Sequence, residues 1–113
     1  MLKKEIKEKI LKNAIYLEEY GINELAWTKE NAKNIIQEII EDKIGVLGGD
    51  VYKLSNNHLE PLSDNWACEP NVNESKEEYF FRSKLESLRY IEEYPLTQGE
   101  NIIFSITFTE KMI

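Results

Sequence analysis

The sequence predicts an α+β domain, in which a small antiparallel sheet packs against about three helices in the order ααβββαβ. Three observations support this prediction. Apolar residues recur at helical spacing up to about residue 42, the pattern becomes strand-like after residue 44, and a well-delimited helix precedes a last, alternating strand. A length of 113 residues suits one domain, and residues 1–113 are expected to form it.

Two helices are expected at the start of the chain. The first spans residues 3–20 and ends at Gly21, which can adopt the left-handed conformation of a helix cap. The second follows Thr28, a good N-cap, and carries one apolar stripe as far as residue 42. The connector between them is apolar, and two of its side chains are expected to fill the core: Leu25 and Trp27.

A β-hairpin is expected next. Residues 46–54 have the composition of a strand, residues 55–58 form a turn, and residues 59–62 form the returning strand. Because Pro61 has no N–H group to donate, the returning strand should lie at the edge of the sheet or near its own end. A short third strand is expected around residues 65–68.

A long third helix and a final strand complete the predicted fold. Ser75 and Glu78 have the spacing of a capping box, so the helix is expected to begin there and to end at about Tyr94, before Pro95. The final strand alternates apolar and polar residues over residues 102–109. The side chains expected on the inner side of the helix are Phe80, Phe81, Leu85, Leu88 and Ile91, with Tyr79 and Tyr90 elsewhere.

The chain is acidic, with 21 Asp and Glu residues against 14 Lys and Arg residues and a formal net charge of -7. Such a charge repels phosphate groups, so neither direct binding of nucleic acid nor binding to a membrane is expected. Residues 59–100 hold ten acids and four bases, which places nearly all of the excess there. This segment is expected to be either a solvated surface that keeps the protein soluble or a docking surface for a basic partner.

The cysteine content and the N-terminal sequence indicate a cytoplasmic protein. Cys68 is the single cysteine, so it has no partner for an internal disulfide, as is usual in a reducing compartment. Residues 1–9 alternate charged and apolar side chains and lack the apolar run of a signal peptide. One Cys and one His are too few for a zinc site of the usual kind, and neither a metal nor a cofactor is expected.

The Gly48-Gly49-Asp50 sequence is the first candidate site. Two glycines weaken a strand unless a bulge or the close approach of another group requires them. Because the chain continues as a strand, these glycines do not resemble a phosphate-binding loop, which would lead into a helix. We expect Asp50 to accept nearby backbone N–H groups or, with Tyr52, to contact a partner. Alternatively, a ligand-sensing domain would show a deep apolar pocket beside the two glycines.

The Asp64-Asn65-Trp66 sequence is the second candidate site. Asp64, Asp50 and Glu69 could lie close together if the strands pair as predicted, and a carboxylate cluster in a cleft would indicate a small hydrolase or a nucleic-acid-processing enzyme. The carboxylates lack the spacing of an EF-hand loop. Trp66 is expected in the core, with a position as interface anchor as the alternative.

Four pieces of sequence occur in order within residues 20–110. They are Gly-Ile-Asn-Glu-Leu-Ala-Trp at 21–27, Val-Leu-Gly-Gly-Asp-Val-Tyr at 46–52, Asp-Asn-Trp at 64–66, and a helical segment over residues 83–94 that ends at Pro95. Together they resemble a family of bacterial polymorphic-toxin immunity proteins, immunity protein family forty. The Gly-Gly-Asp-Val-Tyr strand is the most specific of the four.

The resemblance implies a small cytoplasmic antidote, encoded beside a secreted toxin, that protects the producing cell by binding this toxin. It implies a non-enzymatic protein with no catalytic residues. Pattern residues in such families often maintain the fold, while the toxin-binding surface varies. The positions that match the family pattern are Trp27, Gly48, Gly49, Asp50, Tyr52, Asp64, Asn65 and Trp66.

The acidic charge and the resemblance lead to the same hypothesis. Many toxins of these systems attack nucleic acids and carry basic surfaces, which an acidic antidote can occupy by mimicking the charge of the substrate. The partner is therefore expected to be a basic cognate toxin domain. The residues expected to contact it are Asp50, Tyr52, Asp64, Trp66, Glu69, Glu77 and Glu78.

Overall fold

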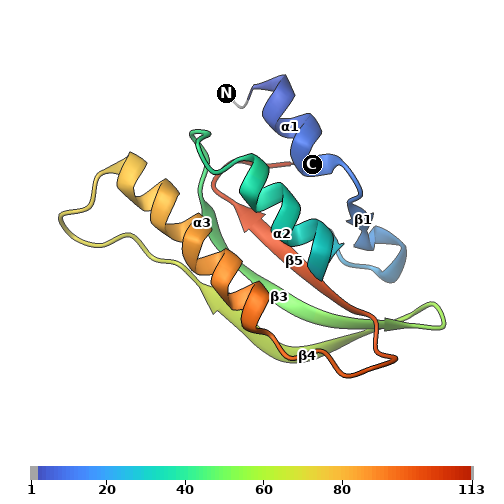
Figure 1. Ribbon diagram of the computed structural model, residues 1–113. Helices are drawn as coiled ribbons and strands as arrows, with labels where there is room; N and C mark the ends of the chain where they lie inside the picture. Colours follow the sequence, from blue (N-terminus) through green and yellow to red (C-terminus); the bar gives the residue numbers. More distant parts are fainter. Residues whose placement is uncertain (1–2, 113) are drawn as a thin grey trace.

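A computed structural model of the protein describes residues 3–112. Within these residues, three α-helices and one 3₁₀ helix accompany a five-stranded antiparallel sheet of order β1-β2-β5-β3-β4, which confirms the predicted α+β class. Helices α2 and α3 lie across one face of the sheet (Figure 1). Along the chain the elements are α1 (Lys4–Leu11), β1 (Ile15–Tyr16), η1 (Leu17–Tyr20), β2 (Leu25–Thr28), α2 (Lys29–Glu38), β3 (Val46–Ser55), β4 (His58–Ala67), α3 (Lys76–Glu93) and β5 (Ile102–Phe108).

The main hydrophobic core lies between the sheet and the three α-helices. Its fully buried side chains include Trp27 of β2, Phe104 of β5 and Ile36 of α2. Trp27 also donates a hydrogen bond of 3.1 Å from Nε1 to the carbonyl oxygen of Ile10, which ties β2 to the last turn of α1. Since Leu25 is also buried, the prediction that Leu25 and Trp27 fill the core is confirmed.

A smaller apolar cluster lies on the opposite face of the sheet. Adjacent residues of a strand point to opposite faces, and Val51 belongs to the main core whereas Tyr52 belongs to this second cluster. Leu17 of η1 packs there against Tyr52 and Ile103. The segment around η1 therefore covers part of this second face. We call the side that carries α2 and α3 the helical face, and the opposite side the open face.

Helix α1 ends at Leu11, so the prediction of a helix over residues 3–20 is wrong. Asn13 turns the chain with a φ of 61°, and Ile15 then pairs with β2. Of the apolar residues that continue the helical pattern, Ala14 lies just before β1 and Leu17 begins η1. Gly21 does adopt the left-handed conformation, with a φ of 83°, but it caps η1.

Helix α2 begins after Thr28 as predicted, and the Thr28 hydroxyl accepts a hydrogen bond of 3.2 Å from a backbone N–H in the first turn. The predicted connector before it contains β2, a strand not predicted from the sequence. The helix ends at Glu38, earlier than predicted. The Lys84 ammonium donates to the carbonyl oxygens of Ile39 and Asp42, at 2.8 and 2.7 Å, and holds the following residues in a turn.

Strands β3 and β4 form the predicted hairpin, and β4 continues through the residues where the sequence predicts a separate strand. A bulge interrupts the pairing. Asp50 pairs with Asn65 and Tyr52 with Pro61, so three residues of β4 lie opposite one residue of β3. Ser63, in this bulge, has a φ of 64°. Because β4 is an edge strand, the prediction for Pro61 is confirmed.

The two glycines of β3 leave room for the backbone and side chains of neighbouring strands. Gly48 has a φ of 153°, and a Cβ at this position would lie 3.0 Å from the Cα of Ala67 and closer still to the carbonyl oxygen of Trp66. A Cβ on Gly49 would overlap the carbonyl oxygen of Ser105 and the indole ring of Trp66. The prediction that another group approaches these glycines closely is confirmed.

The capping box predicted for α3 is present. The Ser75 hydroxyl accepts from the N–H of Glu78 at 3.1 Å, and the Glu78 carboxylate accepts from the N–H of Ser75 at 2.8 Å. The helix ends at Glu93, before Pro95, as expected. No helix within residues 3–112 combines the length and the apolar character that a membrane span needs.

The prediction for the inner side of α3 is wrong in part. Phe81 and Leu85 are 46% and 44% exposed, whereas Tyr79 is only 5% exposed. Ser83 Oγ accepts from the N–H of Val46 at 3.0 Å, and the Tyr79 hydroxyl donates at 2.5 Å to the carbonyl oxygen that follows β4. Hydrogen bonds to the strand ends therefore decide which side of α3 faces the sheet. Its buried ridge, at every fourth residue, is Tyr79, Ser83, Ser87 and Ile91.

Candidate functional site

Asp50 and Tyr52 lie on the open face of the sheet, in a polar cluster with Glu24. Asp50 is paired with Ser105 of β5 and Asn65 of β4, and directly paired residues of antiparallel strands point to the same face. The Glu24 carboxylate accepts hydrogen bonds from the Tyr52 hydroxyl at 3.3 Å and from Ser105 Oγ at 2.7 Å. The structure thus brings together residues from two of the four sequence pieces noted above.

The electrostatics of this cluster keep its phenol protonated. Burial, the charges of Glu24 and Asp50, and the hydrogen bond to Glu24 raise the pKa of Tyr52 to about 12. Burial and the nearby Glu24 charge also raise the pKa of Asp50. Tyr52 is only 7% exposed, so its hydrogen bond to Glu24 is mainly internal to the protein.

Asp50 does not have the structural role expected of it. Its carboxylate accepts no hydrogen bond from any residue in the range 3–112, so the expectation that it accepts nearby backbone N–H groups is wrong. The physical reason is the regular pairing of β3 with β5 around Asp50, where backbone N–H groups already bond across the sheet. A hollow of about 160 Å³ lies beside the cluster and is lined in part by Glu24, Ser105 and Thr107.

Asp64 and Trp66 lie on the helical face, away from Asp50. The Trp66 indole donates from Nε1 to Ser87 Oγ at 2.9 Å and stacks on Tyr90 with 4.7 Å between ring centroids. Asp64 accepts a hydrogen bond of 2.7 Å from the Tyr94 hydroxyl. Both side chains therefore have partners within the protein: Trp66 fastens the edge strand β4 to α3, and Asp64 fastens it to the residue that follows α3.

The three carboxylates considered for catalysis do not come together. Asp50 lies on the open face and Asp64 on the helical face, while Glu69 lies beyond the end of β4. In residues 3–112, no three His, Cys, Asp or Glu side chains are placed to hold a metal ion. Beside Gly49, where a ligand pocket is the alternative expectation, the Trp66 ring fills the space.

Cys68 is buried beneath α3. It is 3% exposed, and its Sγ lies 3.7 Å from the carbonyl oxygen of Ser83 and from Ser87 Oγ. Burial raises the pKa of its thiol, although the hydrogen bond with Ser87 opposes this effect. His58 begins β4 and Cys68 follows its last residue, so the length of the strand separates them and they do not form a nucleophile and base pair.

Glu77 and Glu78 lie in the first turn of α3, and Glu69 lies in the loop that precedes the helix. All three are exposed, and none makes a salt bridge within the described part of the chain. The Glu78 carboxylate serves in the capping box, whereas the Glu69 backbone accepts at 2.7 Å from Arg82. These acids are thus held near one end of the molecule by the start of α3 and by the loop before it.

Half of the acids in residues 59–100 form salt bridges, two of them with the same guanidinium group. Arg82 pairs with Glu74 at 2.5 Å and with Glu86 at 2.8 Å, and its two hydrogen bonds to Glu74 lower the pKa of that carboxyl to about 2. The uncompensated charge is therefore concentrated in the remaining acids. The other paired acids are Glu92 with Lys33, Glu93 with Arg89, and Glu100 with Lys53.

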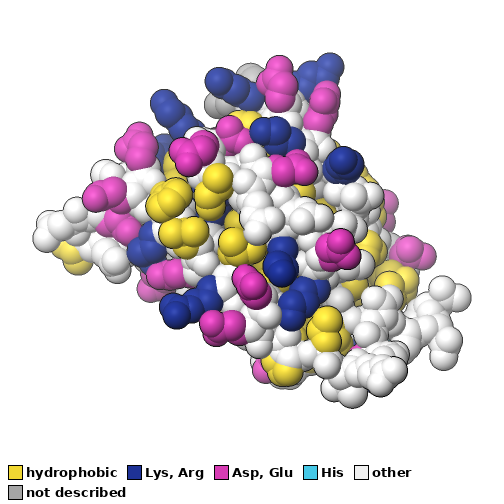
Figure 2. All heavy atoms as spheres, viewed as in Figure 1, with side chains coloured by type: hydrophobic (Ala, Val, Ile, Leu, Met, Phe, Trp, Pro, Cys, Tyr) yellow, Lys and Arg dark blue, Asp and Glu magenta, His cyan; other side chains and the backbone are white. Residues whose placement is uncertain are grey.

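The outer side of α3 carries an apolar surface, although its sequence pattern predicts these residues in the core. Phe81 and Leu85 are four residues apart and thus share one side of the helix. Figure 2 shows apolar side chains gathered over the first half of α3, with acidic side chains along their border. We call this surface the α3 patch and define it as Ile40, Phe80, Phe81 and Leu85.

A comparison with known protein families identifies a match that covers most of the fold. The sequence model of a family described as Immunity protein 40 matches residues 16–108, which include β2, β3, β4, β5, α2 and α3 but not α1. No curated protein and no solved structure matches the chain significantly. Because the family match covers most of the 113 residues, the chain belongs to the immunity protein 40 family.

Proposed function

We propose that the protein is a non-enzymatic antidote that acts in the cytoplasm by binding and neutralising a cognate bacterial polymorphic toxin. Membership of the immunity protein 40 family supports this class of partner. The observation that carries the mode of binding is the group of exposed acids without salt-bridge partners, Glu69, Glu77 and Glu78. Such a group attracts a basic protein surface.

Charge would act mainly on the rate of association. Complementary charges steer two proteins toward each other over distances of about a Debye length, roughly 8 Å at physiological salt, and raise the association rate constant. A toxin that cleaves or modifies nucleic acid needs a basic surface, which the acids near the start of α3 would occupy. Neutralisation then follows from blocking that surface, without any chemical step by the antidote.

The motif residues on the sheet are proposed to support this function indirectly. Tyr52 binds Glu24, Trp66 binds Ser87, and Asp64 binds the tyrosine that follows α3, so each has a partner inside the protein. They hold the sheet and α3 in a fixed relation. The acids at the start of α3 then keep their positions relative to one another, which lowers the entropy lost on binding.

A charge-reversal experiment tests this proposal. The toxin domain encoded beside this chain, in an inactivated form, is mixed with Glu69→Lys/Glu77→Lys, and the association rate is measured by stopped flow at low and high salt. We expect this rate to fall at least about tenfold at low salt, with a small effect on dissociation. Glu78 is left unchanged because it caps α3.

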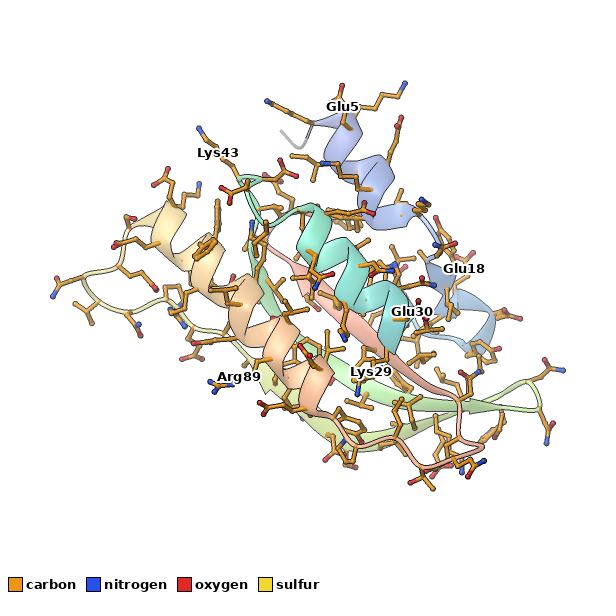
Figure 3. All side chains as sticks on the ribbon, in the orientation of Figure 1. Glu5, Glu18, Lys29, Glu30, Lys43 and Arg89 are labelled. Carbon is orange, nitrogen blue, oxygen red and sulfur yellow. The ribbon has the colours of Figure 1, made fainter. Side chains whose placement is uncertain are left out.

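The control variant is Glu18→Lys/Glu19→Lys. It makes the same change in net charge on η1, and Glu18 lies on the opposite side of the molecule from the start of α3 (Figure 3). We expect a change in association rate of less than about threefold. Equal rates for both variants and the wild type, without dependence on salt, would contradict the electrostatic proposal.

A further inference from the structure

The α3 patch leaves large apolar side chains in water. Phe81 and Leu85 remain 46% and 44% exposed while serines of the same helix are fully buried. Soluble proteins rarely keep large apolar groups together on the surface without a use for them, because covering them is favourable. The arrangement follows from the fold, since hydrogen bonds to β3 and β4 require the serines on the inner side.

A hollow of about 200 Å³ adjoins the patch. It lies between α3 and the loop that connects α2 to β3, and its apolar lining comes from Ile40, Phe80 and Phe81. The charged side chains that line it are three acids, Glu41, Asp42 and Glu77, and two bases, Lys43 and the buried Lys84. The hollow is therefore an apolar depression with carboxylates at its border, a combination that suits an apolar side chain flanked by basic residues.

Lys84 fixes the wall of this hollow. Its side chain is 1% exposed, and its ammonium donates to the carbonyl oxygens of Ile39 and Asp42, on either side of Ile40 and Glu41. The salt bridge of 3.5 Å between Asp42 and Lys9 fastens the same loop from outside. Because the loop is held before any partner arrives, little conformational entropy is lost when a side chain enters the hollow.

The charge around the patch distinguishes between possible partners. The two segments that border it, residues 38–43 and 74–86, hold seven acidic and four basic residues, a net charge of -3. Lys43, one of the bases, lies in the loop after α2 (Figure 3) and also lines the hollow, so the negative charge is an excess over basic groups that are present. A second copy of the chain would bring the same negative charge to the contact and be repelled, whereas a basic protein would be attracted.

We infer that the α3 patch is the anchor of the toxin interface. Its partner is a basic surface that places an apolar or aromatic side chain against Phe81 and Leu85 and into the hollow, with Lys or Arg side chains beside Glu41 and Glu77. This inference rests on the proposed function. The acids of that proposal speed association with the toxin, and the apolar contacts of the patch would slow dissociation of the complex. Interfaces derive most of their affinity from a few central residues, often aromatic, surrounded by contacts that exclude water.

The test compares two double variants that remove the same kind of side chain. Phe81→Ser/Leu85→Ser alters the patch, and Val72→Ser/Leu96→Ser alters two other exposed apolar residues, which are 98% and 51% exposed. Affinity for the inactivated toxin domain encoded beside this chain is measured by calorimetry. We expect Kd to rise at least about thirtyfold for the patch variant and less than about threefold for the control.

Three further readouts make the result decisive. The melting temperature of the patch variant should stay within about 4 °C of the wild type, so that weaker binding is not a result of unfolding. If the wild type binds the toxin and the patch variant binds it with the same Kd, the docking surface is overturned but the proposed function is not. If the wild type does not bind the toxin at all, both are overturned. A wild-type dimer that only the patch variant dissociates, with toxin affinity unchanged, would assign the patch to self-association and overturn the inference.

Discussion

A surface helix usually turns its apolar side inward and its polar side outward, whereas α3 buries hydroxyl groups and exposes large apolar side chains. Its inner side buries Ser83, Ser87 and the hydroxyl of Tyr79, while its outer side exposes Phe81 and Leu85. On the inner side each polar group has a partner in β3, β4 or the helix itself. On the outer side the apolar groups extend into solvent around a shallow hollow.

This difference separates residues that hold the fold from residues that are free for a partner. Small side chains let α3 approach the sheet closely, and their hydroxyls satisfy backbone groups at the strand ends that would be costly to bury alone. The outer apolar residues are not needed for those contacts. Substitutions on the inner side should therefore change stability, and substitutions on the outer side should change binding.

The largest effect on stability is expected from Trp66→Ala. The indole fills the space above Gly49, stacks on Tyr90 and donates to Ser87, so its removal leaves a cavity and loosens β4 from α3. We expect the free energy of unfolding to fall by about 3 kcal/mol, measured by urea denaturation. A loss below about 1 kcal/mol would mean that Trp66 does not join the inner side of α3 to the sheet.

A smaller loss is expected when the inner side of α3 is made apolar. Ser87→Leu raises the hydrophobicity of the helix, but Ser87 is fully buried and its hydroxyl accepts from Trp66. The larger side chain has no space, and the indole N–H loses its partner. We expect the free energy of unfolding to fall by about 2 kcal/mol. If urea denaturation showed the variant to be more stable, apolar packing at this position would be worth more than the hydrogen bond between Trp66 and Ser87.

Little change in stability is expected from the outer side. Phe81→Ser and Leu85→Ser, made singly, remove side chains that are almost half exposed, so each should lower the free energy of unfolding by less than about 1 kcal/mol. Thermal denaturation of each outer variant and of Ser87→Leu under the same conditions compares the loss of stability on the two sides of α3. If either outer variant loses as much stability as Ser87→Leu, the two sides of α3 do not differ in the way described.

The smallest effect is a change in acid sensitivity. Hydrogen bonds from Arg82 hold the pKa of Glu74 at about 2, below its ordinary value of 4.5. A lowered folded-state pKa contributes stability above the unfolded pKa, and this contribution is lost as the pH falls from about 4.5 to about 2. Glu74→Gln should therefore lose less stability than the wild type over this range, as measured by denaturation at several pH values.

The control for this pH experiment is Asp50→Asn. The pKa of Asp50 is raised by burial and by Glu24, so protonation of Asp50 favours the folded state as the pH falls through its raised pKa. Removing this group should increase the acid sensitivity of the protein, the opposite change from Glu74→Gln. The same sign for both variants would show that these two groups do not titrate as the geometry indicates.

Local sequence signals predicted the parts of the fold that depend on neighbouring residues. The capping box of Ser75 and Glu78, the N-cap Thr28 and the strand β5 all form as expected, because each is decided within a few residues. The early end of α1 at Leu11 was not predictable in this way. The apolar spacing continues beyond it, but pairing of Ile15 with β2 competes with the helix and prevails.

The candidate site shows the same limit. Sequence patterns identified Asp50 and Tyr52 but not their neighbour Glu24, which joins them only when the chain segment before β2 returns to the open face. Phe81 and Leu85 look like core residues by composition. Their position outside depends on partners in β3 and β4 that bind the serines of α3, and such long-range hydrogen bonds leave no periodic signal in the sequence.

The buried thiol of Cys68 can be used to measure how often α3 separates from the sheet. Cys68 lies under α3 at its contact with the sheet, so a thiol reagent can react with it only when the helix moves away from β4. The labelling rate then measures how often this junction opens, as exchange rates do for amides. A partner that holds α3 against the sheet would favour the closed state, and the labelling rate would then fall in proportion to the fraction of protein in the complex.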